Sequence, residues 1–71
     1  MKEYAVVYER TKNNWAAYSP DVPGCIATGK TRQEVELRFR DALASHLDLM
    51  KEHGMAIPEP TTEVGHVRVA A

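Results

Sequence analysis

The stretch YSPDVPGCIATGKTRQE, residues 18–34, holds two of the four prolines, two of the four glycines and the single cysteine of the chain. Pro20 predicts the end of a preceding strand, because proline cannot donate a hydrogen bond to a sheet ladder. Asp21 can accept hydrogen bonds from the backbone amides that follow it. Pro23 and Gly24 suit the second and third positions of a type II turn, where proline fixes φ and glycine takes a positive φ. Together with Cys25, these residues predict a structural corner between two strands.

The residues after this corner predict a short strand and then a long helix. The third predicted strand covers residues 25–29. Thr31 and Glu34 form a T-x-x-E capping box at the start of a helix that we expect from Arg32 to His53. Gly54 predicts a left-handed helix terminator. One apolar stripe recurs at helical spacing along this segment: Val35, Phe39, Ala42, Leu43, His46 and Met50.

The residues before the corner predict a hairpin. Alternating aromatic and β-branched residues indicate a strand over 3–9 and a second over 15–19, joined by a polar turn at 11–14. Beyond the helix, residues 57–63 predict an extended, proline-rich connector, and residues 64–71 predict a fourth strand. The order β-β-β-α-β predicts an α+β fold, in which one helix packs on one face of a small, mostly antiparallel sheet.

Length and composition restrict the possible classes of function. With 71 residues the chain is expected to form one domain, residues 1–71, with a small core that benefits from self-association. The net charge of -1 gives no basic excess for nucleic-acid binding. No apolar run is long enough to span a membrane, and no signal peptide opens the chain. A lone cysteine excludes an internal disulfide, so we expect a cytoplasmic protein that forms a dimer or a larger homo-oligomer.

The motifs resemble those of a known family. The run YSPDVPGCIATGKTRQEVE, the amphipathic helix, the following glycine and IPEP at residues 57–60 closely resemble the HicB-like antitoxins over roughly residues 4 to 69. The resemblance implies a partial RNase-H-like fold and a type II toxin–antitoxin system, in which the chain binds and masks a HicA-type, mRNA-cleaving toxin. Many family members also carry a C-terminal DNA-binding segment. Only residues 61–71 follow Pro60, so the chain resembles a short form, and we expect no direct DNA binding.

Candidate partner-binding residues come from the sheet and from the helix. One helix covers only one face of a sheet, and an uncovered face with aromatic side chains is a protein-binding surface by default. A basic, RNA-binding toxin would favour carboxylates at the contact. Leu37 lies opposite the apolar stripe and is a candidate for a second patch. The candidate interface comprises Tyr4, Trp15, Tyr18, Asp21, Glu36 and Leu37.

No catalytic, metal or cofactor site is expected. Cys25 has no neighbouring base in the sequence that would lower its pKa. His46 and His53 are two helical turns apart, too far for one tight metal site. Two alternatives to an antitoxin stay open: a stand-alone oligomeric binding or regulatory module, and a metal-dependent nuclease that uses carboxylates such as Asp21.

Overall fold

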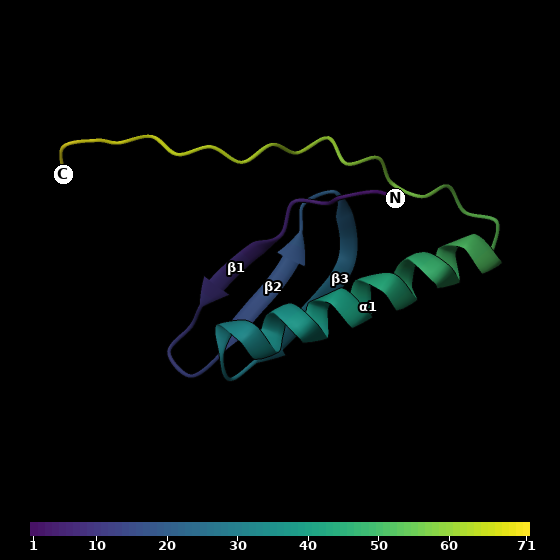
Figure 1. Cartoon of the computed structure of the whole chain (residues 1–71), viewed down its shortest axis with the longest axis horizontal. Coiled ribbons are helices and arrows are strands. Elements are labelled where there is room, and N and C mark those ends of the chain that lie inside the picture. The colour runs from purple at the N-terminus through teal and green to yellow at the C-terminus, as the bar shows by residue number, and fades with distance from the viewer.

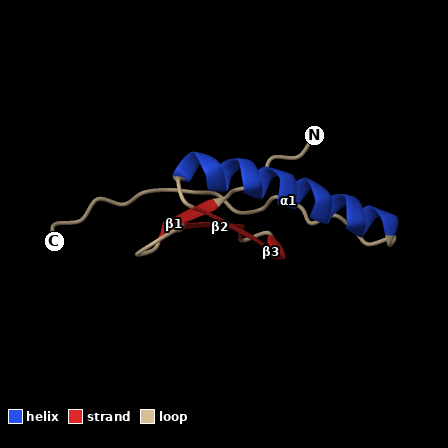
Figure 2. Ribbon diagram, turned by 90° about the horizontal axis from the view of Figure 1, so that it is seen from below, coloured by secondary structure: helices blue, strands red, loops and turns tan.

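The computed structural model describes residues 1–71. It contains, in order, β1 (Val7–Arg10), β2 (Trp15–Ser19), β3 (Val22–Gly29) and α1 (Arg32–Glu52). The strands form one antiparallel sheet in the order β1-β2-β3, and α1 lies along one face of this sheet (Figures 1 and 2). The predicted α+β class, with one helix on one face of a small antiparallel sheet, is confirmed.

The first hairpin follows the predicted pattern. Val7 pairs with Tyr18 and Arg10 pairs with Trp15. Two hydrogen bonds between Thr11 and Asn14 close the intervening loop. The Thr11 amide donates to the Asn14 carbonyl at 2.8 Å, and the Asn14 amide donates to Thr11 Oγ1 at 3.0 Å. The first strand was predicted over residues 3–9, but its ladder with β2 begins only at Val7.

The core between the sheet and α1 is small. Its buried hydrophobic members are Ala17, Val22, Cys25, Val35 and Phe39. Eight half-buried side chains pack against this core: Tyr4, Val6, Tyr8, Trp15, Ala27, Ala42, Leu43 and Leu47. Only 7 of the 71 residues are buried, so much of the apolar surface of this chain stays in contact with solvent.

Both ends of α1 carry the caps that the sequence predicts. Thr31 Oγ1 accepts from the Glu34 amide at 3.0 Å, and Glu34 Oε1 accepts in return from the Lys30 amide at 2.7 Å. In a standard capping box the glutamate would accept from the amide of the capping residue itself; here it accepts from the residue before. At the other end Gly54 has φ +69°, and the Met55 amide donates to the Met50 carbonyl at 2.8 Å. These contacts define a Schellman motif.

The corner between β2 and β3 differs from its prediction in two respects. β3 begins at Val22, which pairs with Ser19, so the strand starts three residues earlier than the predicted 25–29. The next pair is Tyr18 with Ile26, which leaves Pro23, Gly24 and Cys25 as a bulge within β3. Gly24 has φ +85°, the positive value that the sequence predicted.

Asp21 is bonded to a distant segment instead of the amides that follow it. Its Oδ1 accepts from the Thr61 and Thr62 hydroxyls at 3.1 and 2.8 Å, and its Oδ2 accepts from the Thr62 amide at 3.1 Å. The connector after α1 is therefore fastened to the β2–β3 corner.

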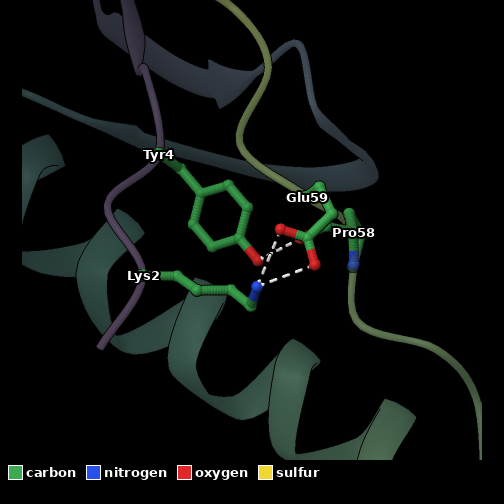
Figure 3. A network of polar contacts seen from close by, with 4 residues as sticks. All are labelled: Lys2, Tyr4, Pro58 and Glu59. Carbon is green, nitrogen blue, oxygen red and sulfur yellow. Dashed lines mark hydrogen bonds and ion pairs between the residues drawn. The ribbon is translucent and has the colours of Figure 1, made fainter.

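The same connector is also fastened to the beginning of the chain. The Tyr4 hydroxyl donates to the Pro58 carbonyl at 2.6 Å, and Lys2 Nζ pairs with Glu59 Oε1 at 2.9 Å (Figure 3). These contacts hold residues 58–62 across one end of the sheet, where β1 begins and where β2 turns into β3.

The predicted fourth strand does not form within this chain. Residues 64–71 are extended but pair with no strand, and the end of this segment extends past the sheet and the helix (Figures 1 and 2). A strand requires a neighbour for its backbone groups, and no neighbour lies beside this segment.

Candidate protein-binding surface

The strand β2 divides its side chains between the two faces of the sheet. Ala17 is 0% exposed and lies in the core beneath α1. Successive side chains of a strand point to opposite faces. Ala16 and Tyr18 therefore lie on the face that α1 does not cover, and Figure 2 shows no element on that side of the sheet.

An apolar row crosses all three strands on this uncovered face. Tyr18 is the pairing partner of Val7 on β1 and of Ile26 on β3. Ile26 is 64% exposed and Tyr18 is 36% exposed, whereas Val7 is half-buried. Directly opposed side chains on one face lie close enough to form a continuous contact surface.

Polar side chains lie beside this apolar row. Glu9, Ala16 and Thr28 form the next cross-strand row on the same face. We call the surface formed by both rows the open sheet face; its residues are Val7, Glu9, Ala16, Tyr18, Ile26 and Thr28. An apolar centre with polar groups at its margin is the typical anatomy of a protein-protein interface.

The predicted interface residues do not lie together on one surface. Tyr4 and Trp15 pack against the core cluster, and the hydroxyl of Tyr4 is bonded to the connector. Tyr18 lies on the open sheet face. Leu37 is 58% exposed, on α1.

The predicted carboxylates already have partners within the chain. Hydrogen bonds from Thr62 hold the pKa of the Asp21 carboxyl below the ordinary value of 3.8. Glu36 pairs with Arg32 and, at 3.6 Å, with Arg40. The Arg32 guanidinium also lies 3.5 Å from the ring centroid of Tyr8, which is a cation–π contact between α1 and β1.

Two members of the apolar row, Val7 and Ile26, were not among the predicted interface residues. The register of the first hairpin, counted outward from the turn at residues 11–14, would have identified Val7 as the partner of Tyr18. The same count from the Ser19–Val22 pair does not identify Ile26, because the bulge at residues 23–25 shifts the register of the second hairpin by several positions.

The residues weighed for chemistry lie in structural positions. Cys25 is 6% exposed in the core, and burial raises the pKa of its thiol above the ordinary value of 9.0. His46 and His53 line a groove of about 370 Å³ between the end of α1 and the corner, together with Val22, Pro23 and Met50. No three histidine, cysteine, aspartate or glutamate side chains are grouped as a metal site would require.

Comparison with known proteins identifies the family. A model described as the HicB-like antitoxin of bacterial toxin–antitoxin systems matches residues 4–69. The chain belongs to the HicB-like antitoxin family.

Its single helix lacks the continuous apolar stretch that crossing a bilayer would demand.

Three relatives are similar to this HicB-like chain over most of its length. It is 35% identical over 60 residues to antitoxin HicB 2 of Photorhabdus laumondii, covering 84% of this chain and 43% of that protein. It is 26% identical over 62 residues to a UPF0150 protein of Thermoplasma acidophilum, covering 86% of this chain and 90% of that one. It is 30% identical over 56 residues to an uncharacterized 14.9 kDa protein of Haemophilus phage HP1, covering 79% of this chain and 42% of that one.

The HicB-like chain thus spans less than half the length of two of these relatives and nine-tenths of the third. No solved structure matches it.

Proposed function

We propose that this HicB-like chain is a non-enzymatic antitoxin of a type II system that binds and masks a HicA-type, mRNA-cleaving toxin. Membership of the family supports the antitoxin role, and the resemblance described above supplies the class of toxin. The open sheet face is the observation that carries the mechanism, because it offers a large apolar row that no element of the chain covers.

The mechanism is steric occlusion. A toxin seated on the open sheet face buries Tyr18 and Ile26, and the body of the antitoxin then blocks the toxin's RNA-binding surface. Glu9 at the margin of this face suits a basic partner, since opposite charges steer two proteins into register. The chain acts in this proposal as a cytoplasmic homo-oligomer.

We also infer that the β-β-β-α order is that of a partial RNase-H-like fold. The antiparallel order β1-β2-β3, followed by one helix on one face, supports this assignment.

The test of toxin binding compares two exposed aliphatic residues on opposite sides of the molecule. Ile26→Asp places a charge in the apolar row of the open sheet face, whereas Leu37→Asp places the same charge on the outer side of α1. Their exposures are similar, 64% and 58%, so the two substitutions perturb the fold to a comparable degree. The measurement is RNA cleavage by a HicA-type toxin titrated with each antitoxin variant.

We expect wild type and Leu37→Asp to protect RNA at a fixed stoichiometry, and Ile26→Asp to need at least tenfold more protein. If Leu37→Asp, and not Ile26→Asp, needs more protein to protect RNA, the toxin-binding surface lies on α1. Failure of the wild type to bind or inhibit any HicA-type toxin would favour the stand-alone module. A metal-dependent nuclease would instead show RNA or DNA cleavage by the chain alone in Mg²⁺ or Mn²⁺, abolished by Asp21→Asn.

A further inference from the structure

Three positively charged side chains without partners meet at one end of the sheet. Of the nine lysine and arginine side chains, four form ion pairs and five do not. Three of these five line a single pocket: Arg10, Lys12 and Lys30. Their charged groups make no hydrogen bond within the chain either. Like charges held close together repel one another, so this grouping favours the binding of an anion that neutralises them.

The remaining side chains of this pocket are neutral and polar or aromatic. They are Thr11, Asn13, Asn14 and Trp15, and no carboxylate belongs to the lining. The two side-chain amides and the indole N–H can each donate a hydrogen bond, and none of them does so within the chain. Cations combined with unused neutral donors are suited to an anion with several acceptor oxygens.

The backbone on both sides of the pocket is fixed by hydrogen bonds. On one side is the β1–β2 loop, which is closed by the two bonds between Thr11 and Asn14. On the other side is the junction of β3 and α1, where the Lys30 amide donates to Glu34 Oε1 at 2.7 Å. Figure 1 shows both segments at the same end of the sheet, away from the N-terminus. Because the backbone is already ordered, an anion has to order only the charged side chains.

The size and charge of the pocket indicate which anion fits. Its volume is about 180 Å³. Pockets that enclose drug-sized ligands measure roughly 300–1,000 Å³, so this one takes a small group and not a whole nucleotide. A phosphodiester or a carboxylate carries a single negative charge, which three cations exceed. The two joined phosphates of a diphosphate carry several charges on neighbouring oxygens and match three cations better.

We propose that this pocket binds a diphosphate group, either free pyrophosphate or the diphosphate of a nucleotide, with Arg10, Lys12 and Lys30 on its oxygens. The sugar and base of a nucleotide would then project into solvent. No residue of the open sheet face lines the pocket, so the proposal does not rest on toxin binding.

The first measurement is an NMR titration of the full chain with sodium pyrophosphate at constant ionic strength. We expect saturable shifts confined to the amides of residues 10–15 and 29–31. Lys12→Gln/Lys30→Gln should weaken binding by at least about tenfold, because each lost cation removes a charge-assisted contact. The matched control is Lys51→Gln/Arg68→Gln, which removes the other two cations without ion pairs, outside the pocket. All four positions are exposed, so circular dichroism should show an unchanged fold.

The outcome of this titration decides between a site and general screening of charge. Absence of saturable shifts at millimolar pyrophosphate would overturn the proposal. An equal loss of affinity in the control variant would also overturn it, since the anion would then respond only to net charge.

The second measurement compares different phosphates by their effect on thermal stability. A ligand that binds only the folded chain raises its melting midpoint. Pyrophosphate should therefore raise the midpoint of wild type and of the control variant, but not that of Lys12→Gln/Lys30→Gln. ADP binding more tightly than pyrophosphate would identify a nucleotide as the source of the diphosphate, and equal binding would identify the diphosphate alone. Orthophosphate, or a short RNA without terminal phosphates, binding as tightly as pyrophosphate would refute the choice of a diphosphate.

Discussion

Asp21 and Thr62 are 41 residues apart in the sequence and are joined by two hydrogen bonds, one from the Thr62 amide at 3.1 Å and one from its hydroxyl at 2.8 Å. This pair links the corner motif before the helix to the threonines after the Pro-x-Pro motif. The joint presence of these two motifs in the sequence therefore has a physical reason, since one supplies the acceptor and the other the donors.

This link predicts a pH-dependent contribution to stability. The Asp21 carboxyl has a pKa below 3.8 in the folded chain, so its charged form is stabilised by folding. The contribution is present above pH 3.8 and is lost as the pH falls through the lower pKa of the folded state. We expect Asp21→Asn to lower the melting midpoint at pH 7 and to converge with wild type below pH 3.8.

The control for this prediction is Asp41→Asn, because Asp41 is exposed and accepts no hydrogen bond. It should melt within a degree or so of wild type at pH 7, as surface substitutions away from such contacts usually do. A difference between Asp21→Asn and wild type that stays constant from pH 7 to pH 2 would show that the charge of Asp21 has no part in the link.

Gly24→Ala should destabilise the fold through the backbone alone. A Cβ at this position would meet no atom within 4 Å, so no steric clash contributes. The φ of +85° is nevertheless strained for alanine, at a cost of roughly 1–2 kcal/mol. For a chain of this size we expect the melting midpoint to fall by about 4–8 °C per kcal/mol. Gly65→Ala is the control, and an equal effect at both glycines would contradict the positive φ at Gly24.

Gly29→Ala should destabilise the fold for a different reason, which is contact. A Cβ at Gly29 would lie 2.9 Å from the Val35 backbone nitrogen and 3.0 Å from Glu34 Oε1. The end of β3 and the first turn of α1 would have to separate, and overpacking of this kind costs about 1–3 kcal/mol. Thermal melts of Gly29→Ala and Gly65→Ala measure the difference. A Gly29→Ala variant as stable as wild type would mean that this junction can relax freely.

Features that depend on neighbours in the sequence were predictable. The helix was predicted from Arg32 to His53 and runs over Arg32–Glu52, because its caps at Thr31 and Gly54 are local hydrogen-bonding motifs. The second strand, over residues 15–19, was predicted with both boundaries correct. In each case neighbouring residues in the sequence determine where the element begins and ends.

Features that depend on distant neighbours were not predictable. The partners of Asp21 lie beyond the helix, so no local rule for aspartate could identify them. The alternating valines of residues 64–71 predicted a fourth strand that does not form within this chain, because an alternating pattern does not supply a neighbouring strand. The open sheet face was expected as a surface, whereas its members Val7 and Ile26 depend on a register that the bulge in β3 alters.

The bond from the Tyr4 hydroxyl to the Pro58 carbonyl bears on the order in which the protein folds. The two residues are 54 positions apart, so this contact closes a loop that includes nearly all of the sheet and the helix. Long loops are slower to close than hairpins and helical turns, which use neighbouring residues. During synthesis the hairpins and α1 can therefore form while the ring of Tyr4 still lacks its partner. We therefore expect residues 58–62 to reach the end of the sheet last, and a chain truncated before Pro58 should fold with that end uncovered.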